Sequence, residues 1–401
     1  MKKVVILGSG IVGIMSSYFL SKAGFSVTVL DSAEKEGMGC SGQNGCQLSF
    51  SHCEPWNSWG SIKSILKSIV KKDSKISSDI IRDKNFWLWG KDVILNSRQK
   101  KIHDIIVNLT EMGQSSRFII ESIIKEENID FKYSKGGILH FYRHKKSFER
   151  AVNISSIQQD IGCNIDLLSA SDVVSIEPNL LKLLESNNLY GGLMHNDDAS
   201  GDIKSFISQI KEICQDRYQV DFKFNHKIKN ILTNYKSITG INTDHGVFKA
   251  DYYLSCLGAY GNKLMQGIGI RDKIYPIKGY SLSMPITKNF LAPKNTITDP
   301  ENKIVYSNIG DQFRVAGTFE VSPIDYKINQ NNIDFLKKTM KSSFVNFGDI
   351  EKADLWQGYR PHSSEIMPIC QQSDEYKNFY INSGHGSLGW TMCFATAKKI
   401  S

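Results

Sequence analysis

The sequence predicts an α/β fold whose two domains are interleaved along the chain. Three observations support this prediction: a strand–helix–strand unit opens the chain, alternating strands recur far downstream, and no repeat or low-complexity linker separates them. At 401 residues the chain is long enough for two or three domains. Hydrophobic residues make up 41% and charged residues 22%, which excludes a disordered tail, a collagen-like repeat and a coiled coil.

The opening unit begins with a β-branched run at 4–7, typical of a strand buried on both faces. Apolar residues then recur at helical spacing as far as Gly24, a residue that commonly follows a helix end. A second strand at 25–30 ends at Asp31, and the whole unit has the length of a βαβ motif. The uncharged stretch 4–21 imitates a secretory signal, but its glycines and serines favour the folded interpretation.

The turn inside this unit has the spacing Gly8-x-Gly10-x-x-Gly13. In a Rossmann-like domain the first glycine makes the tight turn, the second lets a pyrophosphate approach the backbone, and the third lets helix and strand pack closely. Asp31 would accept hydrogen bonds from a ribose hydroxyl. Glycines with a structural role alone are the alternative, but the surrounding strand, helix and acid favour a dinucleotide site.

Downstream elements follow from the spacing of apolar residues, which recur every three to four positions in helices and alternate in strands. An amphipathic helix at 61–76 carries five lysines. The other expected helices are 83–128, 203–213 and 331–344; the expected strands are 137–142, 191–195, 220–224, a three-stranded excursion within 228–253, and several between 275 and 320.

Two later glycine-rich segments indicate which dinucleotide binds. The apolar strand 252–256 breaks at Gly258, as in the second strand–glycine signature of FAD-binding proteins, although any strand end could look the same. The loop 384–389 contains three glycines and precedes a helical pattern, so its backbone N–H groups can form a concavity. Such a loop can stabilise negative charge on a reduced flavin ring, and the alternative is a sharp bend before a final helix.

Arg360 stands between Tyr359 and Pro361, shortly before this loop. The neighbouring Gly358 and Pro361 constrain its backbone, and its planar guanidinium can bind a carboxylate through two parallel hydrogen bonds. A surface arginine without a partner is the alternative interpretation.

Charge and cysteine content restrict the partners. The net charge of +8 is compatible with anionic substrates or an anionic membrane surface and is too small to indicate nucleic acid, so no nucleic-acid partner is expected. The lysines of 61–76 would contact such a membrane, unless this helix simply packs on its own protein. Eight cysteines without a C-x-x-C pair predict reduced thiols, a reducing compartment and no metal ligand set.

Together these residues resemble the FAD-dependent D-amino-acid dehydrogenase family (small subunit), within the larger glycine oxidase/D-amino-acid oxidase superfamily. The resemblance covers essentially the whole chain. The family usually has Ala-Gly where this chain has Gly45-Cys46, so we expect the Cys46 side chain to enter a position of backbone contact. Five motifs in family order carry the resemblance: Ser41-x-x-Asn44-Gly45-Cys46-Gln47 with Pro55-Trp56, Asn196 to Asp202, Tyr275 to Leu282, Gly358 to Pro361, and Gly384 to Met392.

The resemblance implies a Rossmann-like FAD-binding domain formed by 1–84, 190–262 and 352–401, and a substrate-binding domain formed by 85–189 and 263–351. The substrate domain is expected to be α+β, on a mixed or antiparallel sheet. The cofactor contacts implied are Gly8, Gly10, Gly13, Asp31, Ser41, Asn44, Gly45, Gln47, Gly258, Gly384, His385, Gly386, Leu388, Gly389, Trp390 and Thr391.

The activity implied is oxidative deamination of D-amino acids such as D-alanine to 2-oxo acids and ammonia, by hydride transfer to FAD. Arg360 would bind the substrate carboxylate, with Tyr280 and Tyr306 as further pocket residues. Electrons would pass to a quinone or other respiratory acceptor. The protein would then be cytoplasmic, with a peripheral contact on the cytoplasmic face of the inner membrane.

Four alternatives stay open at this point. A related glycine, sarcosine or opine oxidase and the flavin subunit of a multi-subunit amine dehydrogenase use the same motifs. An NAD-dependent dehydrogenase would leave the C-terminal glycine loop unexplained. A flavin-binding scaffold without turnover is the alternative from another functional class.

Overall fold

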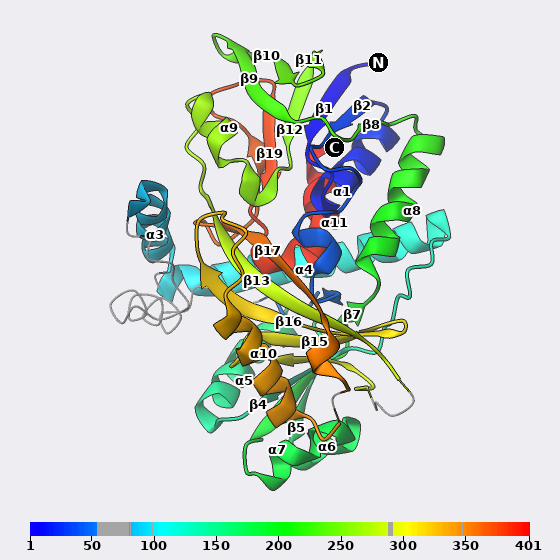
Figure 1. The fold of residues 1–401 in the computed structure, drawn as a ribbon, viewed down its shortest axis with the longest axis vertical. Helices are drawn as coiled ribbons and strands as arrows, with labels where there is room; N and C mark the ends of the chain where they lie inside the picture. Colours follow the sequence, from blue (N-terminus) through cyan, green and yellow to red (C-terminus); the bar gives the residue numbers. More distant parts are fainter. Residues whose placement is uncertain (54–79, 81, 98, 288–291, 347) are drawn as a thin grey trace.

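Two large β-sheets organise the computed structural model, a six-stranded sheet in the upper part of Figure 1 and an eight-stranded sheet in the lower part. The described residues are 1–53, 80, 82–97, 99–287, 292–346 and 348–401. The predicted helix at 61–76 lies outside these residues. The α/β class and the mixed sheet predicted from the sequence are both present.

The six-stranded sheet contains the predicted strand–helix–strand unit. Its strands from β19 to β8 run parallel, and β18 is antiparallel at one edge. The helix of the unit, α1 (Ile11–Lys22), is followed by Gly24 at a φ of +91°, so the predicted helix end is confirmed. In order across the sheet the strands are β18 (Ile369–Gln372), β19 (Phe379–Ser383), β12 (Tyr252–Ser255), β1 (Lys3–Leu7), β2 (Ser26–Leu30) and β8 (Asp221–Lys223).

Both faces of this sheet are covered, which explains the uninterrupted apolar sequence of β1. Val4 and Ile6 face a core shared with α1, α8 (Ile203–Asp216) and α11 (Gly389–Ile400). Val5 and Leu7 face the opposite core. That second core is closed by α9 (Asn262–Gly267) and a three-stranded sheet of β9 (Ile228–Asn234), β10 (Ser237–Thr243) and β11 (Gly246–Phe248).

The eight-stranded sheet is antiparallel except where β4 pairs with β14. One of its faces packs against α10 (Gln330–Ser343), α6 (Ala170–Ile176) and α7 (Leu181–Glu185). In order across the sheet the strands are β17 (Asp354–Ser363), β13 (Ile274–Pro285), β16 (Gln312–Val321), β15 (Ile304–Ile309), β14 (Thr296–Asp299), β4 (Ile138–Tyr142), β6 (Gly191–His195) and β5 (Ile165–Ser169).

The helical region expected at 83–128 forms two helices, α3 (Lys84–Asn96) and α4 (Gln99–Glu127). Helix α5 (Lys145–Asp160) covers the β4–β6 end of the larger sheet, and the short pair β3 (Gln47–Leu48) and β7 (Ala199–Ser200) forms a separate ribbon. Strands β6 and β17 belong to the eight-stranded sheet, whereas the sequence boundaries assign both to the FAD-binding domain. The division into two domains stays a prediction.

The cysteines are all free thiols, six of them buried, as their spacing predicts. Within the described part of the chain, none of the helices is both long and apolar enough to cross a bilayer.

Candidate active site

A cavity of about 980 Å³ runs from the carboxyl ends of β1, β2, β12 and β19 to one face of the eight-stranded sheet. Its size is at the upper end of the range for small-molecule sites. Gly13, Gly384 and Tyr306 are the sequence-predicted site residues that do not line it. The predicted residues that line it are Gly8, Gly10, Asp31, Ser41, Asn44, Gly45, Gln47, Gly258, Tyr280, Arg360, His385, Gly386, Leu388, Gly389, Trp390 and Thr391.

The three N-terminal glycines have different surroundings. Gly8 has a φ of +100°, and a Cβ there would lie 2.7 Å from the carbonyl oxygen of Cys256. A Cβ at Gly13 would overlap the carbonyl oxygen of Gly8, which confirms its predicted role in helix–strand packing. At Gly10, at the start of α1, a Cβ would meet only Ser41 Oγ, at 3.3 Å. Gly10 therefore leaves open space beside the N-terminus of a helix, where an anion is favoured.

Asp31 lies at the end of β2 and lines this part of the cavity. Its Oδ2 accepts hydrogen bonds from the backbone N–H and hydroxyl of Ser9, both at 2.7 Å, and its Oδ1 accepts one from the N–H of Ala33 at 2.9 Å. A carboxylate has about four acceptor positions. One position is left for a ribose hydroxyl, and the carboxylate is already held in place by the glycine-rich turn.

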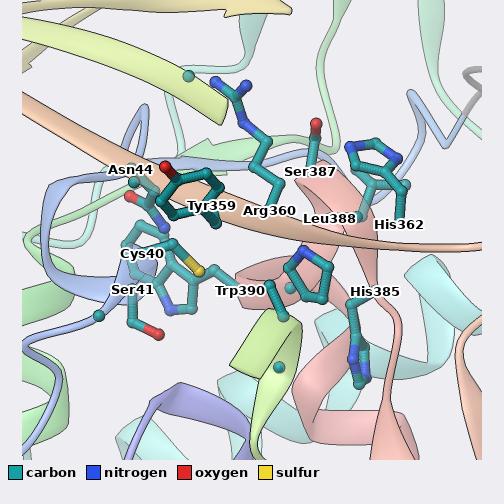
Figure 2. A pocket seen from close by; sticks show the side chains of 18 of the residues that line it. Cys40, Ser41, Asn44, Tyr359, Arg360, His362, His385, Ser387, Leu388 and Trp390 are labelled. Carbon is teal, nitrogen blue, oxygen red and sulfur yellow. The ribbon is translucent and has the colours of Figure 1, made fainter. Parts of the chain in front are cut away.

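The opposite end of the cavity is formed by the C-terminal glycine loop. Gly384 has a φ of +82° and Gly386 one of +57°, and the next helix, α11, begins without a side-chain cap. Figure 2 shows Ser387 of this segment drawn above the strand that carries Arg360 and Trp390 drawn below it. The predicted glycine turn ahead of a helix is therefore present, and the concavity of backbone N–H groups stays a prediction.

His385 in this loop is neutral. Its Nε2 lies 3.0 Å from the hydroxyl of Thr396, and burial lowers its pKa to about 3. Thr391 is also engaged, because its Oγ1 accepts a hydrogen bond from the N–H of Ser49 at 3.0 Å. The indole N–H of Trp390 has no hydrogen-bond partner among the described residues.

The segment 41–47 forms the wall between these two ends. Ser41 Oγ accepts a hydrogen bond from the N–H of Ile11 at 3.1 Å, and Gln47 Nε2 donates to Thr298 Oγ1 at 3.0 Å. Asn44 Oδ1 accepts from the N–H of Cys46 at 2.8 Å. These contacts join the first turn of α1 to β14 across the cavity.

The expectation that the Cys46 side chain would enter a position of backbone contact is wrong. Cys46 has a φ of +58°, which explains why a glycine is favoured there, and its side chain is buried in the core. Its Sγ lies 3.3 Å from Nη1 of Arg314 and does not line the cavity. At the preceding position, a Cβ on Gly45 would overlap Cγ2 of Val305, so the side chain of Val305 occupies the space that an alanine would need.

Arg360 projects from β17 over the backbone of β13, where the missing side chain of Gly279 leaves room for the guanidinium. Nη1 donates to the carbonyl oxygen of Thr318 at 2.9 Å, and Nη2 donates to that of Gly317 at 3.5 Å. Burial lowers the pKa of Arg360 from its ordinary value, yet a guanidinium stays protonated. In the described part of the chain no acidic side chain lies within ion-pair distance of it. A partly buried cation without an internal counter-ion is suited to bind an anionic ligand.

Thr318 has a role that sequence reasoning missed. It has a φ of +65°, unusual for a β-branched residue, at a register shift between β13 and β16. The shift presents the carbonyl groups of Gly317 and Thr318 to Arg360. Backbone strain of this kind concentrates at functional sites. A bulge leaves no recognisable signal in a single sequence, because any residue type can occupy it.

Tyr280 and Tyr306 lie mainly on the other face of the sheet. The hydroxyl of Tyr280 donates to Glu320 Oε2 at 2.9 Å and accepts from the N–H of Asn329 at 3.0 Å, and its ring belongs to the core under α10. Tyr306 is fully buried in the same core, with its ring 4.7 Å from that of Phe344. The structure thus places Tyr280 at the border of the cavity and Tyr306 away from it.

The residues present fit a flavin dinucleotide. Gly10 leaves room for a pyrophosphate, Asp31 has a free acceptor position, and the uncapped start of α11 offers backbone donors at the far end of the cavity. Bound FAD would supply the two-electron acceptor, and Arg360 would hold an anionic substrate group on the adjoining face of the eight-stranded sheet.

Comparison with known proteins agrees with this geometry. Residues 3–401 match the family described as DAO, FAD dependent oxidoreductase. Several relatives are named D-amino acid dehydrogenase. The protein from Vibrio vulnificus (strain CMCP6) is 30% identical over 399 residues, and the match covers 100% of this chain and 95% of the relative. The protein from Chromohalobacter salexigens is 30% identical over 399 residues, and the match covers 100% of this chain and 94% of the relative.

Two solved structures have similar folds. The glycine oxidase from Bacillus cereus has a TM-score of 0.75 at 17% identity, covering 100% of this chain and 94% of that one. The L-alpha-glycerophosphate oxidase from Mycoplasma pneumoniae, solved with FAD bound, has a TM-score of 0.74 at 16% identity, with the same coverage. The full-length family match and the relatives at 30% identity lead to one conclusion: this chain belongs to the DAO family of FAD-dependent oxidoreductases.

Proposed function

We propose that the protein oxidatively deaminates D-amino acids, such as D-alanine, to 2-oxo acids and ammonia by hydride transfer to FAD. The observation that carries this proposal is Arg360, a partly buried guanidinium on the cavity wall that two backbone carbonyls orient and no acidic side chain in the described residues neutralises. The relatives named D-amino acid dehydrogenase support the amino acid as substrate class.

Arg360 binds the substrate carboxylate in this proposal. The hydrogen bonds to Thr318 and Gly317 use two of its five N–H groups and fix the plane of the guanidinium, so the remaining donors are available to a carboxylate. Fixing one end of a small amino acid restricts where its Cα–H can point, which is the main contribution positioning makes to such a reaction.

The proposed reaction does not require the protein to supply a strong base. The hydride leaves a substrate whose amine is neutral, the resulting imino acid is hydrolysed to a 2-oxo acid and ammonia, and no strong base is needed. Two of the histidines that line the cavity, His385 in the glycine loop and His362 on β17, agree with this: burial lowers the pKa of His385 to about 3 and that of His362 well below its ordinary value. Both imidazole rings are therefore uncharged at neutral pH.

We further propose that electrons leave the protein to a quinone or other respiratory acceptor, and that the protein is cytoplasmic with a peripheral contact on the anionic face of the inner membrane. The net charge of +8 supports an anionic partner surface. Flotation with cardiolipin vesicles tests this contact: binding at low salt should be lost at high salt and in the Lys63→Glu, Lys67→Glu, Lys71→Glu triple variant. Absence of flotation even at low salt would contradict it.

A substrate screen separates the proposed function from its alternatives. Purified holoenzyme should reduce a dye acceptor with D-alanine faster than with glycine, sarcosine or octopine, and faster than it reduces oxygen. Preference for glycine or sarcosine with oxygen as acceptor would instead indicate an oxidase of the same superfamily.

A further inference from the structure

Trp356 lies on the same strand as Arg360, and both side chains line the cavity. Residues an even number of positions apart in a strand face the same side of the sheet. Trp356, Gly358 and Arg360 therefore face the cavity together. The indole and the guanidinium are both only partly buried, so both are available to a ligand in the cavity.

A pair of glycines places these two groups next to each other. Gly358 on β17 is paired directly with Gly279 on β13. A Cβ built on Gly358 would overlap the six-membered ring of the Trp356 indole, and a Cβ built on Gly279 would overlap the guanidinium of Arg360. The Cβ positions of directly paired residues lie about 5 Å apart. The indole and the guanidinium therefore lie over neighbouring glycines on one face of the sheet, within the span of a single amino acid.

The next strand of the sheet leaves room in front of the indole. Strand β16 lies on the other side of β13, where Gly317 pairs with Tyr280 and Ala316 pairs with Ser281. Gly317 and Ala316 both line the cavity. Residues with little or no side chain thus extend the floor of the cavity beyond the glycine pair, which leaves space for a bulky ligand group.

Further aromatic rings line this part of the cavity. The ring of Tyr359 lies 6.4 Å from the rings of Tyr260 and Tyr326, edge to face, and all three residues line the cavity. The hydroxyl of Tyr359 accepts a hydrogen bond from the N–H of Asp325 at 2.9 Å, and Gln357 Nε2 donates to the carbonyl oxygen of Tyr326 at 2.6 Å. These two contacts hold the segment that carries Tyr326 against β17.

The charges around the cavity favour a neutral ligand group beside the indole. Within the described part of the chain, the acidic side chains that line the cavity are Asp31 and Glu301. Asp31 is held by Ser9 at the dinucleotide end. Glu301 follows β14 and precedes β15, which is three strands from β17, about 14 Å at the usual spacing. A cationic side chain at the indole would therefore meet the guanidinium of Arg360 without a nearby carboxylate from either acid.

We propose that the Trp356 indole binds the substrate side chain, so that the protein prefers D-amino acids with aromatic side chains, such as D-phenylalanine, over D-alanine and over saturated side chains of similar size. This inference rests on the proposed function and specifies its substrate class. With its α-carboxylate on Arg360, an aromatic D-amino acid places its ring against the indole across the glycine pair. Stacked or edge-to-face rings attract each other beyond the effect of the area they bury.

The test compares D-phenylalanine with D-cyclohexylalanine, whose side chain has a similar size without an aromatic ring. For the purified holoenzyme we expect kcat/KM to be about fivefold higher with D-phenylalanine, the usual strength of one aromatic contact, and lowest with D-alanine and D-lysine. Trp356→Leu should remove the difference between D-phenylalanine and D-cyclohexylalanine. Trp356→Phe keeps a ring at this position and should retain most of the difference.

A second variant separates recognition from a structural role. Gly358→Ala keeps the tryptophan but puts a methyl group where the indole lies, so it should also lower the ratio of D-phenylalanine to D-cyclohexylalanine. If Trp356 only supports the strand, both variants should lower kcat/KM for all substrates alike, and an unchanged ratio would overturn the inference. Trp87→Leu is the matched control: Trp87 lies on α3, is 48% exposed and does not line the cavity, so the ratio should equal that of the wild type.

A binding measurement keeps this inference separate from the proposed function. The acids 3-phenylpropionate and 3-cyclohexylpropionate lack an amine and cannot be oxidatively deaminated, and their binding to the holoenzyme is followed through the visible flavin spectrum. The phenyl compound should bind more tightly, with the difference lost in Trp356→Leu. Equal binding, or a difference that persists in Trp356→Leu, would overturn the inference even if D-alanine is a substrate. The expected binding without oxidation of any D-amino acid would contradict only the proposed function.

Discussion

The guanidinium of Arg360 lies over the backbone of Gly279, in the space that a side chain at position 279 would occupy. A Cβ built on Gly279 comes within 2.5 Å of Cζ of Arg360. The two residues sit on adjacent antiparallel strands, and Gly279 is paired directly with Gly358. A glycine on β13 therefore determines where the guanidinium of Arg360 on β17 can lie.

Gly279→Ala should displace the guanidinium of Arg360 and weaken substrate binding. A displacement of about 1 Å at a positioning group costs about a hundredfold in catalytic efficiency, so we expect kcat/KM for D-alanine to fall by that order. Steady-state kinetics measure it. Gly267→Ala is the control, since a Cβ there meets nothing within 4 Å. Unchanged kinetics in Gly279→Ala would show that the position of Arg360 is unimportant.

Arg360→Lys keeps the positive charge and removes the planar pair of donors. Because an ammonium cannot hold both the bulge carbonyls and a carboxylate in that geometry, transition-state binding should weaken by about 2–4 kcal/mol, comparable to truncating a buried charge pair. Both a higher KM and a lower kcat for D-alanine are expected. The same change at Arg271, which pairs with Asp92 at 2.6 Å on the surface, should leave the kinetics unchanged.

Gly10→Val tests the dinucleotide end of the cavity. Only Ser41 Oγ lies near a Cβ at this position, so the apoprotein should fold, while the valine side chain fills the space meant for the pyrophosphate. We expect a colourless protein with a melting temperature close to that of wild-type apoprotein. Gly8→Val is the contrasting variant: its positive φ and the nearby carbonyl of Cys256 predict loss of the fold itself. A yellow Gly10→Val protein with full flavin content would assign this glycine a structural role.

Buried histidines should make the protein lose stability in mild acid. His140 packs between the rings of His52 and His195, at 4.0 and 4.5 Å, and burial together with these two neighbours holds its pKa well below the ordinary value. Below pH 6.5 the unfolded chain therefore binds protons that the folded chain does not. Stability must then fall with decreasing pH, by about 1.4 kcal/mol per pH unit for each such group.

His140→Phe keeps a ring in the cluster and removes one of these groups. Urea unfolding at pH 5 to 6.5 should show a shallower loss of stability than in the wild type, with little difference above pH 7. Asp198, whose pKa burial raises to about 7, acts with the opposite sign across this range, but it is present in both proteins. An identical pH dependence in the two proteins would mean that His140 is protonated in the folded state.

The N-terminal half of the site could be predicted because its information is local. One βαβ unit contains Gly8, Gly10, Gly13 and Asp31. The spacing of these residues along the unit is enough to predict the steric or hydrogen-bonding role of each. The C-terminal loop was predictable for the same reason. Gly384 and Gly386 take left-handed conformations directly before α11, as a glycine-rich turn ahead of a helix suggests.

The substrate half depends on strand pairing, which a single sequence does not reveal. Successive side chains in a strand point to opposite faces, so Gly279 faces the cavity while the ring of Tyr280 packs under α10. The same parity directs Tyr306 into the core and leaves its neighbour Val305 on the cavity wall. The bulge at Thr318 depends on the register between β13 and β16, and the close approach of Arg360 to Gly279 depends on the pairing of β13 with β17.

Anaerobic mixing of the purified holoenzyme with D-alanine tests the central claim most directly, because reduction of the flavin needs no assumption about the electron acceptor. We predict that the visible flavin absorbance is lost with D-alanine and kept with L-alanine, and that the loss is much slower in Arg360→Lys. Full retention of the flavin absorbance with D-alanine and with other D-amino acids, in a preparation that dithionite reduces normally, would contradict the account.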